Sequence, residues 1–220
     1  LTVAAPITSA GAANLSAGDD VAIAAPVTAA GSVTLAAGAG DADGAGALAI
    51  NAAVTAGGAL TTSSVGNTTL AAPLTAAGSM TLASYGDLTL APSANILSGS
   101  PLALSMTTYT PTSTIDIGRS LGTADTATLT SVAIHTQGVV RFTNEATRLQ
   151  AVNDISINPL VGDRTASQQI ATIGRDGVLN GTNRETRDLT FETTARGATI
   201  TLGPREKMSV LGDLSLRTDG

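Results

Sequence analysis

Four aspartates stand at the start of a recurring short pattern, and carboxylates at a fixed place in a repeat are candidates for acid–base chemistry. Each aspartate precedes an apolar, a Ser or Thr, and a second apolar residue, and the four are Asp87, Asp154, Asp188 and Asp213. Cleavage of a polysaccharide would require two or three such carboxylates close together, and Arg187 would add a cation beside Asp188. In the alternative, each side-chain oxygen accepts hydrogen bonds from nearby backbone N–H groups in a turn. We favour the turn role, and we expect no catalytic residues.

One acidic stretch suggests a metal site. Residues 38–46 read GAGDADGAG, which makes Asp41 and Asp43 weak calcium candidates. Solenoids that bind calcium stack several copies of such a loop, because one turn supplies only half of the ligands. The chain has one copy, so we expect an acidic insertion loop, with no metal and no cofactor.

Histidine and aromatic residues offer little chemistry. His135 is the only histidine, and no Ser or Asp spacing around it suggests a triad, so we expect a solvent-facing strand residue. The aromatic residues are too few and too scattered for a carbohydrate-stacking platform, and we expect them in core gaps or loops. They are Tyr85, Tyr109, Phe142 and Phe191.

Threonines recur with the period of the repeat, which raises the possibility of an ice-binding surface. Thr34, Thr61 and Thr81 are predicted to form an outward ladder on one sheet. Each lies singly between inward apolar residues, whereas an ice-binding array needs paired threonines. Ala22 and Ala49 interrupt the equivalent series in another strand. We therefore regard this function as a minor alternative.

The composition limits the possible fold classes and binding partners. Of the 220 residues, 43% are hydrophobic but only 2% are aromatic, which favours a narrow interior of Ala, Val, Leu and Ile. There are no cysteines, so disulfides and thiolate chemistry are excluded. The net charge of −6 argues against nucleic acid and anionic membranes, and residues 1–118 contain no Lys or Arg. No apolar run approaches the roughly 20 residues of a membrane span.

A repeat of about 20 residues organises the first part of the chain. Its clearest feature is the motif apolar-Thr-x-x-Gly, which occurs four times with offsets of 20, 27 and 20 residues. The aligned glycines are Gly11, Gly31, Gly58 and Gly78, and the aligned prolines are Pro6, Pro26 and Pro73. We expect the glycines at corners where φ is positive. The prolines are expected at a strand end or corner, because they cannot donate a ladder hydrogen bond.

This pattern predicts an all-β fold. Apolar residues alternate with Thr, Ser or Ala over three to five positions, which is the period of strands, and the fixed repeat indicates a solenoid. We predict a single-stranded right-handed parallel β-helix of about 11 coils, or roughly 50 Å of rod. Residues 1–98 are predicted to form regular coils, and 99–220 to continue the same β-helix with longer, charged loops. We also expect the chain to be an interior fragment of a longer polypeptide.

The repeat resembles the haemagglutinin-type repeats of filamentous haemagglutinins. The resemblance rests on residues 86–91 (GDLTLA), on 74–83 (LTAAGSMTLA) and on the parallel residues of earlier copies. It covers residues 1–98 well and 150–220 loosely. It implies a secreted or surface-exposed rod, often adhesive, exported from a Gram-negative bacterium by two-partner secretion. The chain shows Asn158-Pro159 but not the family's secretion-domain motif, and autotransporter passengers share the same rod.

Three functions remain open at this point. The first is a non-enzymatic structural and adhesive rod at the cell surface or outside the cell, which contacts receptors or glycans of host or neighbouring cells through residues 99–220. The second is a self-assembling filament or surface-layer subunit, whose partners are like subunits. The third is a polysaccharide-active β-helix. None of them requires nucleic acid or membrane insertion of this segment.

Overall fold

In the computed structural model, the described residues are 1–40, 45–98, 101–123, 127–136, 138–143, 146–158, 169–172, 188–202, 207–210 and 213–218. They form strands and turns and contain no helix. Accordingly, no helix in these ranges is able to cross a membrane. The calcium candidates Asp41 and Asp43 lie outside the described residues, as does Arg187.

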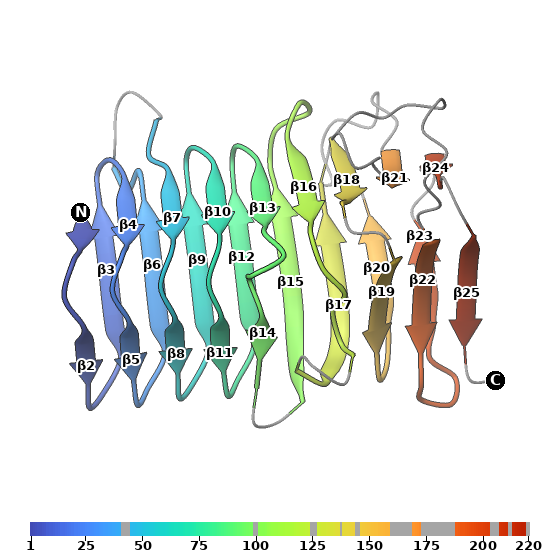
Figure 1. Ribbon diagram of the computed structural model, residues 1–220, viewed down its shortest axis with the longest axis horizontal. Helices are drawn as coiled ribbons and strands as arrows, with labels where there is room; N and C mark the ends of the chain where they lie inside the picture. Colours follow the sequence, from blue (N-terminus) through green and yellow to red (C-terminus); the bar gives the residue numbers. More distant parts are fainter. Residues whose placement is uncertain are drawn as a thin grey trace.

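The strands fall into four parallel sheets (Figure 1). The first sheet has nine strands: β1 (Thr2–Val3), β4 (Val21–Ile23), β7 (Leu48–Ile50), β10 (Thr68–Leu70), β13 (Leu88–Leu90), β16 (Thr114–Ile117), β18 (Val139–Phe142), β21 (Gln169–Thr172) and β24 (Lys207–Ser209). The second has five: β2 (Ile7–Ser9), β5 (Val27–Ala29), β8 (Val54–Ala56), β11 (Leu74–Ala76) and β14 (Ile96–Leu97).

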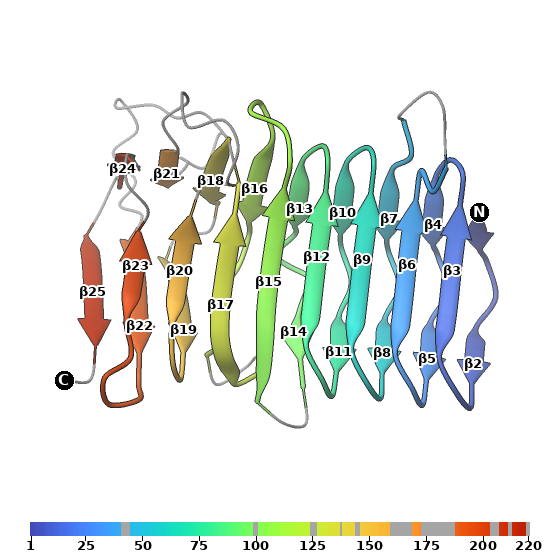
Figure 2. The same cartoon turned by 180° about the vertical axis from the view of Figure 1, so that it is seen from behind.

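The other two sheets complete each turn of the chain. The third sheet has eight strands: β3 (Ala13–Ala17), β6 (Val33–Ala37), β9 (Leu60–Ser64), β12 (Met80–Ser84), β15 (Leu102–Thr108), β17 (Leu129–His135), β20 (Ile155–Asn158) and β23 (Ile200–Leu202). The fourth has three: β19 (Ala146–Ala151), β22 (Asp188–Thr193) and β25 (Leu214–Thr218). In Figures 1 and 2 the first and second sheets share one side of the molecule and the third covers the other.

The chain is a parallel β-helix, as the repeat predicts. Successive coils pair in parallel with equivalent residues in register, as in Val27 with Val54 and Val54 with Leu74. In Figure 1 the nearer strands run down the page and the farther strands run up while the chain advances to the right, so the helix is right-handed. Pairing continues across residue 98, because β12 pairs with β15 and β13 with β16.

The expected number of coils, about 11, is wrong. The first sheet crosses the described part of the chain nine times. Along this sheet, paired residues are 27, 25, 30 and 38 positions apart in the successive steps from Leu88 to Ile115, Val140, Ile170 and Met208. The later coils therefore contain more residues than the 20-residue copies on which the expectation was based.

Alternation along each strand builds the core. In the three-residue strands of inner coils, such as β8 and β11, the outer two side chains point inward and are buried, and the central one faces outward. Burying a Val or Leu side chain stabilises a fold by about 1.5–3 kcal/mol, and these side chains stack in continuous ladders. Phe142 and Phe191 are fully buried and meet edge to face with ring centroids 5.8 Å apart, so both phenylalanines fill the core as expected.

The aligned glycines of the repeat allow the backbones of successive coils to stack closely. The expectation that they have positive φ is wrong. Among the described residues, positive φ occurs at Gly38, Gly40, Gly122 and Gly197 only. In the repeat, the N–H of Gly78 donates to the carbonyl of Gly58 (3.0 Å), and that of Gly58 to Gly31 (3.1 Å). A Cβ at Gly78 would lie 3.2 Å from backbone atoms of the preceding coil, and one at Gly58 would lie 2.8 Å from Ser32 Oγ. Glycine is favoured there because two backbones approach closely.

The three prolines lie at strand starts. Pro6, Pro26 and Pro73 directly precede β2, β5 and β11, and all three are exposed. Their carbonyls still join the ladder: Pro26 accepts from the N–H of Ile7 (2.9 Å), and Pro73 from that of Val54 (3.1 Å). Because each proline lies just before a strand, the ladder requires no N–H donor at its position.

Candidate functional site

Asp87, Asp154 and Asp188 act as caps between coils, as do Asp20 and Asn67. In each case a side-chain oxygen accepts a hydrogen bond from a backbone N–H that belongs to the following coil. The pairs are Asp20 with Ala47 (2.8 Å), Asn67 with Asp87 (2.8 Å), Asp87 with Thr114 (2.7 Å), Asp154 with Thr199 (2.8 Å) and Asp188 with Asp213 (2.8 Å). Two of these oxygens also accept from a hydroxyl, that of Thr114 (3.1 Å) and that of Thr199 (2.9 Å).

These carboxylates do not converge. Asp87 precedes β13 of the first sheet, Asp154 precedes β20 of the third, and Asp188 begins β22 of the fourth. The motif therefore marks strand starts at three corners of the coil. Of the four aspartates in the pattern, Asp188 and Asp213 lie on adjacent coils at equivalent positions, and their contact is a cap. The shared sequence pattern thus reflects a common need for a cap.

Asp154 shows what the cap does electrostatically. Hydrogen bonds from the N–H and the hydroxyl of Thr199 stabilise its charged form and hold the pKa of the carboxyl below the ordinary value of 3.8. The described residues contain no group of three or more His, Asp or Glu that could hold a metal ion. His135 ends β17 as a half-buried residue whose neighbours in the strand alternate inward, so it faces outward.

The threonine ladder has the predicted register. Thr34 pairs with Thr61, and Thr61 with Thr81, on the outer face of the third sheet. All three are half-buried and lie between buried inward residues. A second column, Thr8, Thr28, Thr55 and Thr75, runs along the second sheet, with one threonine per strand. Each column is single, as the sequence indicates.

The two tyrosines are stacked, so the expectation that the aromatic residues are scattered is wrong for them. Tyr85 and Tyr109 follow Ser84 and Thr108, which are partners in register on adjacent coils. The ring centroids are 4.7 Å apart and the planes differ by 30°, while 53% of Tyr85 and 40% of Tyr109 remain exposed. Parallel register brings together side chains that lie 24 positions apart in sequence. The pair forms a small exposed aromatic surface at one corner.

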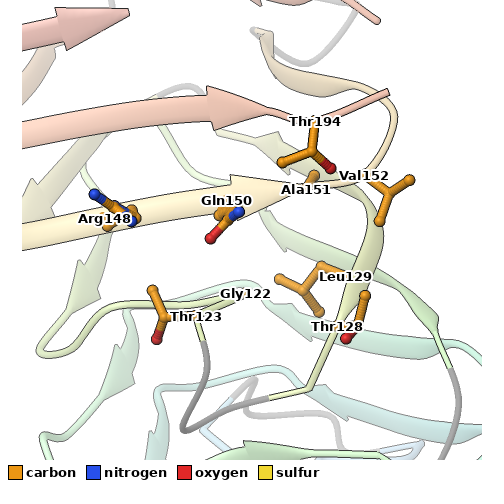
Figure 3. A pocket seen from close by; sticks show the side chains of 9 residues that line it. All are labelled: Gly122, Thr123, Thr128, Leu129, Arg148, Gln150, Ala151, Val152 and Thr194. Atoms are coloured by element: carbon orange, nitrogen blue, oxygen red, sulfur yellow. The ribbon is translucent and has the colours of Figure 1, made fainter. Parts of the chain in front are cut away.

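A polar pocket opens where the line of the second sheet is interrupted. Between β16 and β17 the described residues form no strand, only an isolated bridge between Leu121 and Leu149. The β2–β14 sheet therefore ends at this coil, and the β19–β25 sheet begins in the next one. The pocket has a volume of about 400 Å³ and is lined by Gly122, Thr123, Thr128, Leu129, Arg148, Gln150, Ala151, Val152 and Thr194 (Figure 3).

The bridge fixes the wall of this pocket. The N–H of Leu121 donates to the carbonyl of Arg148 (2.9 Å), and that of Gln150 to the carbonyl of Leu121 (2.9 Å). Gly122 follows with φ of +76°, and a Cβ there would lie 1.8 Å from the carbonyl oxygen of Gln150. Only glycine fits this turn without displacing β19. Leu121, Leu129 and Leu149 are buried beneath it and form a rigid apolar base.

Charged and polar side chains surround the opening. Arg148 is 45% exposed, and its Nη1 lies 3.5 Å from Oε2 of Glu192, whose side chain is 22% exposed. Across the described residues, the side chains of Gln150 and Thr194 donate or accept no hydrogen bond. Figure 3 shows Gln150 between Arg148 and Leu129, facing the Gly122–Thr123 segment. The pocket thus presents a guanidinium group, an amide and a hydroxyl to solvent.

Sequence reasoning placed charge after residue 98 but did not predict this pocket. A signal was present: the stretch from Gly118 to Thr128 lacks the apolar-Thr-x-x-Gly motif that β2, β5, β8 and β11 carry. No protein-family model matches the chain, and no curated protein or solved structure matches it significantly.

Proposed function

We propose that this chain is a non-enzymatic segment of a structural and adhesive rod of the filamentous-haemagglutinin type, located at a bacterial surface or outside the cell. The observation that carries the proposal is the continuous parallel pairing of the coils, with side-chain caps between them. Such a solenoid supplies length and rigidity, because each coil contacts only its neighbours and can be repeated.

The distribution of side chains supports different roles for the first and the later coils of the rod. In the first coils the outward residues are small and polar, as in the threonine columns, and Lys and Arg are absent from residues 1–118. The later coils carry the pocket and ion pairs on their outer faces. We propose that the first part spaces the molecule and that the later part contacts receptors or glycans of other cells. Two-partner secretion is the proposed export route.

Two measurements test this function. Small-angle scattering and electron microscopy of the purified chain should give single rods, about 40 Å long for nine stacked strands at the usual strand spacing. Beads coated with the chain should bind cultured epithelial or bacterial cells more than albumin-coated beads do. Absence of cell binding would contradict adhesion, and ordered fibres of the native chain would favour a self-assembling filament instead.

A further inference from the structure

We propose that the Arg148 pocket binds an acidic sugar, with its carboxylate on the guanidinium group of Arg148. This inference rests on the proposed adhesive function and names a ligand class for it. The pocket volume of about 400 Å³ falls within the range of small-molecule sites. One or two sugar rings fit a space of this size.

Arg148 is the group that selects an anion. Among the described residues its exposed guanidinium makes one ion pair, at 3.5 Å, and its other N–H groups make no hydrogen bond there, so they can bind a ligand. A planar guanidinium binds a carboxylate through two parallel hydrogen bonds, which an ammonium group cannot reproduce. The backbone of Arg148 is held on both sides: its N–H donates to Ser120 Oγ (3.0 Å), and its carbonyl accepts from Leu121.

The remaining polar groups suit the hydroxyls of a sugar. Gln150 presents both a donor and an acceptor, and Thr194 adds a hydroxyl. Neither side chain has a hydrogen-bond partner among the described residues, so binding would replace water rather than break protein contacts. Glu192 lies on the neighbouring strand β22 outside the pocket lining, and its ion pair positions the guanidinium group of Arg148.

The wall and base of the pocket are fixed before binding. Gly122 is held by a backbone approach that excludes any Cβ, and the leucines beneath it are buried. A ligand therefore orders the side chains of Arg148, Gln150 and Thr194 but no backbone, which limits the entropic cost of association. An acidic peptide is the competing partner, but the lining offers hydroxyl and amide groups rather than an unpaired strand edge.

Nuclear magnetic resonance of the ¹⁵N-labelled chain tests the proposal directly. Sodium glucuronate should shift the side-chain amide signals of Gln150 and the backbone signal of Gly122, with a Kd in the millimolar range. Glucose should bind at least about tenfold more weakly, because it lacks the charge-assisted pair. Hexaglutamate should shift these signals less than glucuronate does.

Variants at two arginines distinguish binding in the pocket from nonspecific attraction of the ligand to a positively charged surface. Arg148→Gln should weaken glucuronate binding about tenfold or more. Arg148→Lys should give an intermediate Kd, because lysine keeps the charge but cannot make the two parallel hydrogen bonds of a guanidinium group. Arg196→Gln removes an equal charge from an exposed turn residue that does not line the pocket, and it should change Kd less than twofold. Circular dichroism should show that all three variants keep the wild-type fold.

Four results would contradict the proposal that this pocket binds an acidic sugar. They are the absence of glucuronate shifts at Gln150 and Gly122, equal binding of glucose, stronger binding of hexaglutamate, or unchanged binding in the Arg148→Gln variant. Bead adhesion is measured with the same variants. Normal adhesion by the Arg148→Gln variant would show that the pocket is not needed for adhesion, without contradicting the adhesive function. Absence of adhesion by the wild-type chain would contradict the adhesive function itself.

Discussion

Replacing Asp87 with alanine should destabilise the β-helix measurably, because one carboxylate oxygen caps two donors of the next coil. Asp87 Oδ1 accepts from the N–H of Thr114 at 2.7 Å and from its hydroxyl at 3.1 Å. A hydrogen bond to a charged group contributes about 1.5–3 kcal/mol. Since both donors share one partly exposed oxygen, we expect a loss of about 2–3 kcal/mol in total. For a chain of this size that lowers Tm by about 5–10 °C.

The matched control is Asp87→Asn, which keeps an oxygen at the same place. Asn67 already performs this role one coil earlier, where its Oδ1 accepts from the N–H of Asp87 at 2.8 Å. We therefore expect Asp87→Asn to cost less than about 1 kcal/mol. Thermal unfolding followed by circular dichroism measures both variants, and amide hydrogen exchange at Thr114 localises the effect. Equal Tm values for the two variants, or unchanged protection of Thr114 in the alanine variant, would refute the capping argument.

Three further predictions follow from stacking and charge. Gly78→Val should cost about 1–3 kcal/mol by denaturant unfolding, because its side chain would press on backbone 3.2 Å away, whereas Gly11→Val should cost little since a Cβ there meets no atom within 4 Å. Alanine variants of Asp116 and Arg141, whose side chains are ion-paired and which are partners on adjacent coils, should show a double-mutant coupling energy of about 0.5–1 kcal/mol. Lowering the pH should release the cap made by Asp154. Its folded pKa lies below 3.8, so the carboxylate stabilises the fold above that value, and the contribution disappears as the pH falls through the folded pKa.

Each of these predictions has an outcome that contradicts it. Equal losses of stability for the two glycine variants would show that stacking does not restrict Gly78. Strict additivity of the Asp116 and Arg141 variants would mean that the ion pair contributes nothing. For Asp154, the amide signal of Thr199 should titrate with a midpoint below 3.8, and a midpoint at or above this value would exclude the cap.

Much of the fold could be predicted from the sequence because local pattern and global architecture agree. The alternation of apolar and small residues fixes which side chains face inward, as in β12 (Met80–Ser84). Equivalent positions 20 residues apart, such as Leu74 and Val54, are partners in the structure. The predicted continuation of the β-helix after residue 98 also forms, with strands such as β16, β18 and β23.

The remaining features depend on contacts between coils that the sequence pattern does not reveal. The stacked pair of Tyr85 and Tyr109 requires the register of a 24-residue coil, which differs from the 20-residue period. The role of Gly78 follows from backbone approach rather than from φ. The pocket arises from a strand that does not form after Gly118, and the missing motif could have indicated it.

The caps also couple each coil to the one that follows. In all five, the acceptor side chain belongs to the earlier coil and the donor N–H to the later one. A hydrogen bond needs both partners in place, so each cap forms only when two neighbouring coils are folded together. We therefore expect neighbouring coils to open cooperatively, and native-state hydrogen exchange would show similar protection for residues 68–90 and 114–117. Strong protection on one side of a cap and none on the other would contradict this coupling.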